Sequence, residues 1–174
     1  DLFGALMAGL ATALAGGTVR DLLLGRKVFW LADETYLQIS VIAALVTFFI
    51  TRVRHLPEKL FLIPDAIGMA LFAIVGTQVA LDWNMPWLTA SLLGVLAAVL
   101  GGLLRDVMIN EVPLVFTSEL YATAAWIGGM TLIALDAMHV DTTLAAWIAI
   151  VVGVTVRMIA IRWKVTLPRF SNHA

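Results

Sequence analysis

Long apolar runs, separated by short polar turns, follow one another along nearly the whole chain. Each run approaches the roughly 20 residues that an α-helix needs to cross about 30 Å of hydrocarbon. Prolines fall near several of the turns and are expected to mark helix boundaries, because proline disfavours continuation of a helix. They are Pro57, Pro64, Pro86 and Pro113. The pattern predicts six transmembrane helices at about residues 1–24, 36–51, 60–81, 87–109, 120–136 and 143–163.

One stretch of the chain occurs twice, as Gly16-Gly17-Thr18-Val19-Arg20-Asp21 and as Gly101-Gly102-Leu103-Leu104-Arg105-Asp106, 85 positions later. Without a gap, residues 9–36 match residues 94–121 at eight of 28 positions. A fixed-period repeat of this kind predicts two related halves. We predict a first repeat over residues 1–56, a second over 57–138, and a final helix with its tail over 139–174. The first repeat lacks a counterpart of the span at 60–81, so we expect one further helix before Asp1, seven in all.

Three spans in each repeat would place the second repeat upside down in the bilayer, as in many transporters. We call the side reached after the first span side A, and the opposite side B. Side A receives three cations and side B at least seven, so the positive-inside rule puts side B and the C-terminus in the cytoplasm. The side A cations are Arg20, Arg26 and Lys27; those of side B are Arg52, Arg54, Lys59, Arg105, Arg162, Lys164 and Arg169.

Composition supports an all-α integral membrane protein. The chain is 61% hydrophobic and only 13% charged, where soluble domains run near one half and one quarter. It has no cysteine, its three histidines are scattered, and no basic stripe suggests nucleic acid. No pattern typical of a catalytic triad, a phosphate-binding loop or a metalloprotease is present. We therefore expect a protein that is not an enzyme and needs no cofactor.

The two glycine pairs, Gly16-Gly17 and Gly101-Gly102, admit two interpretations. Small residues allow close packing of helices in lipid. Alternatively, the helix bends or breaks there and exposes carbonyl groups to a polar path, which is tolerated only where protein or water covers them. We favour the second, because an Arg-Asp pair follows each glycine pair.

Charged residues near the span ends are candidates for the mouths of such a path. Arg20-Asp21 and Arg105-Asp106 lie where ionisable groups are costly and commonly functional, although an arginine can also extend to the headgroups. Asp65 follows Pro64 and either caps a helix or faces the path from the cytoplasmic side.

An acid and a tyrosine mark the beginning of the next span in each repeat. They are Glu34 with Tyr36 and Glu119 with Tyr121. We expect both pairs to be structural, with the acids at positive helix ends and the tyrosines at the membrane interface.

Together, the repeated Gly-Gly-x-x-Arg-Asp, the sequence Pro64-Asp65-Ala66-Ile67-Gly68 and the run Asn110-Glu111-Val112-Pro113 resemble bacterial membrane proteins with paired glycine-transporter-type domains. These are similar to the trimeric intracellular cation (TRIC) channels. The resemblance implies a seven-helix fold of inverted repeats, a homotrimer, and a potassium-permeable pore in each protomer between two glycine-kinked helices. Gly16, Gly17, Gly101 and Gly102 match the kinks, and Arg20, Asp21, Arg105 and Asp106 the charges beyond them. Animal members carry Lys-Glu-Gly where glycine-rich stretches stand here.

We therefore expect a monovalent cation channel of the bacterial inner membrane, passing potassium and sodium, with Asp65 at its cytoplasmic mouth. The second hypothesis is a secondary transporter of glycine or another small zwitterion. The third is a structural membrane protein without any path.

Overall fold

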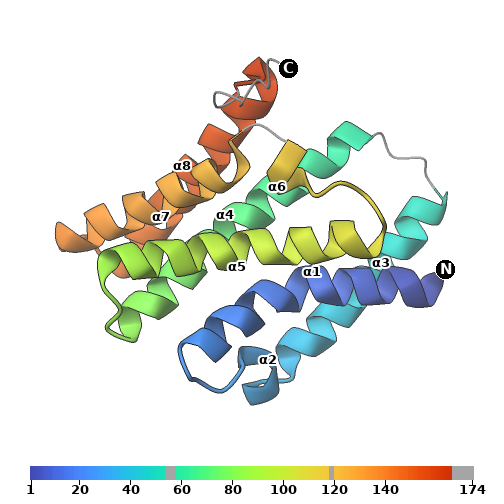
Figure 1. Cartoon of the computed structure of the whole chain (residues 1–174), viewed down its shortest axis with the longest axis horizontal. Helices are drawn as coiled ribbons and strands as arrows, with labels where there is room; N and C mark the ends of the chain where they lie inside the picture. The colour runs from blue at the N-terminus through green and yellow to red at the C-terminus, as the bar shows by residue number, and fades with distance from the viewer. Residues whose placement is uncertain (54–57, 118–119, 166–174) are drawn as a thin grey trace, which may run out of the picture.

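The computed structural model describes residues 1–53, 58–117 and 120–165. Eight helices follow one another in this part of the chain (Figure 1): α1 (Leu2–Leu23), α2 (Phe29–Ala32), α3 (Thr35–Val53), α4 (Glu58–Asp82), α5 (Trp87–Met108), α6 (Leu114–Thr117), α7 (Tyr121–Ala137) and α8 (Thr142–Trp163). Each end of the six long helices lies within two residues of the corresponding end of a predicted span. Five are long and apolar enough to cross a membrane, and the sixth, α7, has 17 residues.

Pro64 is a correction to the predicted boundaries. It lies inside α4, six residues after the first residue Glu58, instead of at a helix boundary. Membrane helices tolerate an internal proline because neighbouring helices and local adjustments satisfy the freed backbone groups. α4 thus begins only two residues before the predicted start at about residue 60, and both Pro64 and Asp65 are internal residues of the helix.

The period of 85 residues extends to the helix bounds themselves. α1 and α5 begin and end 85 positions apart, and so do the four-residue helices α2 and α6. Figure 1 shows α1 and α5 running in opposite directions, with α2 below this pair of helices and α6 above it. The repeats are therefore inverted, as predicted. The short helices were not predicted.

α5 is the central helix and packs against α1, α4 and α7. α8 packs on α4 and α7, whereas α3 packs on α1 and α2. Alanines and glycines fill these contacts, for example Ala73 of α4 and Ala97 of α5, both buried. Small side chains let helix backbones approach closely, which is how helices associate in lipid.

The surface of the described residues carries many large apolar side chains. They occur on every long helix, and α3 has no buried residue among those described. Such a surface suits contact with acyl chains and would be costly in water. The chain is an integral membrane protein.

Candidate functional site: a cleft beside the second glycine pair

The two Arg-Asp pairs make the same hydrogen bonds in both repeats. We call this arrangement, in which an aspartate binds both the preceding arginine and the next short helix, the clamp. In the first, Asp21 accepts a hydrogen bond from Arg20 Nε at 2.8 Å and another from the Phe29 backbone N–H at 2.8 Å. In the second, Asp106 accepts from Arg105 Nε at 2.8 Å and from the Leu114 N–H at 3.0 Å. Each aspartate thus ties the end of a long helix to the first residue of the following short helix.

The turn inside each clamp has the same backbone conformation. Gly25 has φ of 66° and Asn110, its equivalent, has φ of 60°. This left-handed region favours glycine and, after it, asparagine. The chain therefore reverses direction in the same way after α1 and after α5, and the aspartates are structural as well as charged.

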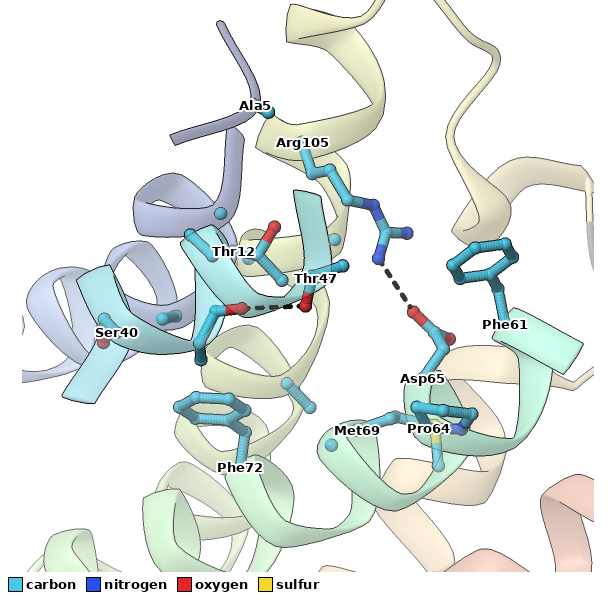
Figure 2. A pocket seen from close by; sticks show the side chains of 18 of the residues that line it. Ala5, Thr12, Ser40, Thr47, Phe61, Pro64, Asp65, Met69, Phe72 and Arg105 are labelled. Carbon is cyan, nitrogen blue, oxygen red and sulfur yellow. Dashed lines mark hydrogen bonds and ion pairs between the residues drawn. The ribbon is translucent and has the colours of Figure 1, made fainter. Parts of the chain in front are cut away.

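A cleft of about 600 Å³ opens between α1, α3, α4 and α5. Its walls are mostly apolar, with a charged pair and several hydroxyl groups among them (Figure 2). The charged pair is Asp65 of α4 and Arg105 of α5, and Figure 2 shows the guanidinium group extending towards the carboxylate. The Arg105 Nη1 atom lies 3.3 Å from Asp65 Oδ1.

The Arg105 side chain is shared between two carboxylates. Its Nε atom binds Asp106 and its Nη1 atom binds Asp65, while 27% of the side chain remains exposed. The equivalent Arg20 is only 5% exposed and lies outside the cleft. The same sequence thus produces a buried clamp in one repeat and a clamp open to the cleft in the other.

Hydroxyl groups from α1 and α3 line the cleft. Thr12, Ser40 and Thr47 each donate a hydrogen bond to the carbonyl oxygen four residues earlier in the same helix. A hydroxyl that donates in this way keeps lone pairs with which it can accept a hydrogen bond or contact a cation. The cleft therefore presents oxygen atoms to whatever enters it.

The structure brings four of the predicted site residues to this cleft. They are Gly101, Gly102, Arg105 and Asp65. Asp106 lies directly behind Arg105. The other predicted residues, Gly16, Gly17, Arg20 and Asp21, are buried near the far end of α1 and do not line the cleft. Their role in a path stays a prediction.

The glycine pairs lie within continuous helices, since neither α1 nor α5 is interrupted there. A Cβ atom on Gly16 would come within 1.9 Å of the Ala97 carbonyl oxygen, and one on Gly101 within 2.3 Å of the Thr12 carbonyl oxygen. These two contacts are related by the 85-residue period. The close-packing interpretation therefore applies to Gly16 and Gly101, which let α1 and α5 cross with their backbones in contact.

Of the two interpretations of Asp65, the structure favours the second: α4 begins before Asp65, so this residue does not cap the helix, and its carboxylate faces the cleft. The expectation that both tyrosines lie at the membrane interface was wrong for Tyr121. Tyr36 is 51% exposed, as expected of an interfacial residue, but its equivalent Tyr121 is 5% exposed and lines the cleft. Glu119 lies outside the described residues.

Arg157 of α8 contributes to the site in a way that the sequence analysis missed. It is only 1% exposed, and its guanidinium carbon lies 4.9 Å from the centre of the Tyr121 ring. The Tyr121 hydroxyl interacts in turn with Asp65. An arginine within an apolar span was the available signal, because such a residue commonly faces the protein interior. Within the described residues, no group of three or more acidic or histidine side chains could hold a metal ion.

Comparison with known proteins places this chain in a family. The family model described as "Glycine transporter" matches residues 1–52 and 62–137. The chain belongs to this family. The inner membrane protein YadS of Escherichia coli, of the UPF0126 group, is 37% identical over 98% of this chain and 84% of its own. A UPF0126 membrane protein of Vibrio cholerae is 37% identical over 98% of this chain and 72% of its own.

Solved TRIC channels have the same fold. A TRIC cation channel studied for the basis of conductance superposes with a TM-score of 0.90 and 34% identity, covering 100% of this chain and 86% of that one. The TRIC trimeric intracellular cation channel orthologue of Rhodobacter sphaeroides gives a TM-score of 0.80 and 31% identity, covering 95% and 96%. The resemblance drawn from the sequence is confirmed.

Proposed function

We propose that this protein is a potassium-permeable monovalent cation channel, with one path in each protomer. The observation that carries the proposal is the cleft of about 600 Å³, which extends from Asp65 and Arg105 to the crossing of α1 and α5. The similarity to TRIC cation channels supports the same function. In this proposal the protein is a homotrimer in the bacterial inner membrane, side B faces the cytoplasm, and no cofactor is needed.

The charges at the cleft favour cations. Asp65 and Asp106 bring two carboxylates, and Arg105 brings one guanidinium group between them. These three side chains together carry one net negative charge, and the further cation Arg157 lies behind the Tyr121 ring and does not line the cleft. In a narrow cleft with apolar walls, such a charge is screened less than in bulk water and raises the local cation concentration. The hydroxyl oxygens that line the cleft would replace part of the hydration shell of the ion.

Planar bilayer recording of the purified full-length protein tests this proposal. We expect unitary currents in a potassium gradient, with a reversal potential close to that of potassium. Asp65→Asn removes one negative charge at the cleft and should move the reversal potential towards zero. Asp82→Asn is the matched control, because Asp82 ends the same helix outside the cleft and binds Gln78. An absence of cation currents, or equal reversal potentials in all three proteins, would contradict the proposal.

One observation favours a transporter as the second candidate. Asp65 and Arg105 present opposite charges 3.3 Å apart on one wall, which could receive the ammonium and carboxylate groups of a zwitterion. The family description names glycine. Proteoliposomes loaded with unlabelled glycine distinguish the two functions: saturable counterflow of labelled glycine without unitary currents supports the transporter. A purely structural protein would show neither.

A further inference from the structure

The two repeats differ most at the second glycine of each pair. In the second repeat, the atoms nearest to a Cβ built on Gly102 are polar and belong to Tyr121 and Arg105, at 3.6 and 3.7 Å. In the first repeat, a Cβ on Gly17 would lie only 2.5 Å from the ring of Phe29. The space that opens into the cleft beside Gly102 is thus filled by an aromatic ring beside Gly17.

Phe29 is held in this place from several directions. Its backbone N–H donates to Asp21 at 2.8 Å. Its ring meets the Tyr36 ring edge to face, with centroids 5.1 Å apart, and the Arg20 guanidinium carbon lies 6.0 Å from its centre. The next residue, Trp30, donates from Nε1 to the Thr18 hydroxyl at 2.9 Å. α2 is therefore docked on the end of α1 by both backbone and side chains.

The equivalent helix α6 lacks two of these features because of its sequence. Leu114 stands in place of Phe29, and Val115 in place of Trp30. The partner of Trp30, Thr18, is replaced by Leu103. Neither Val115 nor Leu103 has a polar side-chain atom, so the second anchor of α2 has no counterpart. Tyr121 faces Arg157 and the cleft, whereas Tyr36 faces Phe29.

We infer that the Phe29 ring is a hydrophobic plug that closes the path on side A, and that α2 holds this ring in place. The inference rests on the proposed function, because it assumes that the cleft continues past the crossing of α1 and α5 towards side A. Apolar constrictions exclude water and so block ions. Opening then requires the ring to leave Gly17, while the α6 end near Gly102 stays accessible from side B.

Cysteine labelling of the full-length protein in sealed vesicles tests the plug without relying on currents. Residues 1–174 contain no cysteine; any cysteine outside this stretch of the full-length protein is first replaced by serine, so that each introduced thiol is the only one. Ala13→Cys reports on the cleft, because Ala13 lines it at the level of the helix crossing. Lys27→Cys, in the exposed loop before α2, identifies side A. A charged, membrane-impermeant thiol reagent is then added to one side at a time.

We expect Ala13→Cys to react from side B and to react slowly from side A. Adding Phe29→Ala should make labelling from side A at least about tenfold faster, which corresponds to about 1.4 kcal/mol. Adding Leu114→Ala, the matched change in the other repeat, should leave labelling from side A unchanged. Trp30→Phe keeps the plug but removes one anchor, and should raise the rate by a smaller factor. Size-exclusion profiles check that each variant is folded.

Two results would overturn the plug. If Ala13→Cys reacts from side B but Phe29→Ala and Trp30→Phe leave its labelling from side A unchanged, the path is not closed by Phe29, although the cleft of the proposed function stands. If Ala13→Cys reacts from neither side, the cleft is dry and both the plug and the proposed function are wrong.

Discussion

Replacement of Gly16 by alanine gives a quantitative test of the crossing between α1 and α5. The new Cβ would stand 1.9 Å from the Ala97 carbonyl oxygen, where ordinary contact begins near 3.4 Å. The two backbones must therefore separate by roughly 1.5 Å, and overpacking of this kind costs about 1–3 kcal/mol. Gly68→Ala is the matched control, because a Cβ at Gly68, also within a long helix, would meet nothing within 4 Å.

Both substitutions gain the same helix propensity, about 1 kcal/mol in a soluble helix, so their difference isolates the steric cost. Reversible unfolding in mixed micelles with increasing SDS, followed by circular dichroism, measures the free energy of unfolding of each variant. We expect Gly16→Ala to be about 1–3 kcal/mol less stable than Gly68→Ala. Gly101→Ala should lose a similar amount of stability, because its Cβ would lie 2.3 Å from the Thr12 carbonyl oxygen. Equal stabilities of Gly16→Ala and Gly68→Ala, within about 0.5 kcal/mol, would refute the close crossing.

Three further predictions follow from the clamps and the helix crossing. Asp21→Asn should destabilise the fold by about 3–5 kcal/mol in the same unfolding assay, because it leaves the buried Arg20 without its carboxylate; Asp65→Asn should cost less, since Arg105 keeps Asp106. The double variant Gly16→Ala/Gly101→Ala should lose less stability than the two single losses added together, because the first substitution already separates the helices that the second must separate. The pKa of Asp33 lies below its ordinary value because its carboxylate accepts hydrogen bonds from the Thr35 hydroxyl and N–H. Since the pKa is lower in the folded state than in the unfolded state, Asp33 stabilises the fold at pH values above its unfolded pKa. This stabilisation is lost as the pH falls through the folded pKa. An NMR titration of the Asp33 carboxyl carbon should therefore show a midpoint below that of the Thr35→Ala variant, and equal midpoints would contradict the bond.

The transmembrane helices and their inversion could be predicted from the sequence, because long apolar runs and a gapless 85-residue repeat are strong signals. The short helices α2 and α6 have four residues each, too few for any hydrophobic period to be recognised. Pro64 misled the prediction of a boundary, because its effect on α4 depends on the neighbouring helices, which the sequence pattern does not describe.

The candidate site was predicted only in part, for a related reason. Identical residues of the two repeats have different surroundings: Arg20 is buried while Arg105 lines the cleft, and Gly17 contacts Phe29 while Gly102 contacts Tyr121. A repeated motif predicts the same backbone twice, but the residues that break the symmetry lie outside the motif. Arg157, in a helix that belongs to neither repeat, is the clearest example.

The most direct test of a cation path through this cleft is single-channel recording of Gly102→Leu. Gly102 lines the cleft, and a leucine side chain there would project towards Tyr121 and Arg105 and narrow it. Gly4→Leu, at an exposed position of α1, is the control for the same change in size. A path through the cleft predicts a clearly smaller unitary potassium current for Gly102→Leu and an unchanged one for Gly4→Leu. Equal currents in Gly102→Leu and the unmodified protein would show that ions do not pass here.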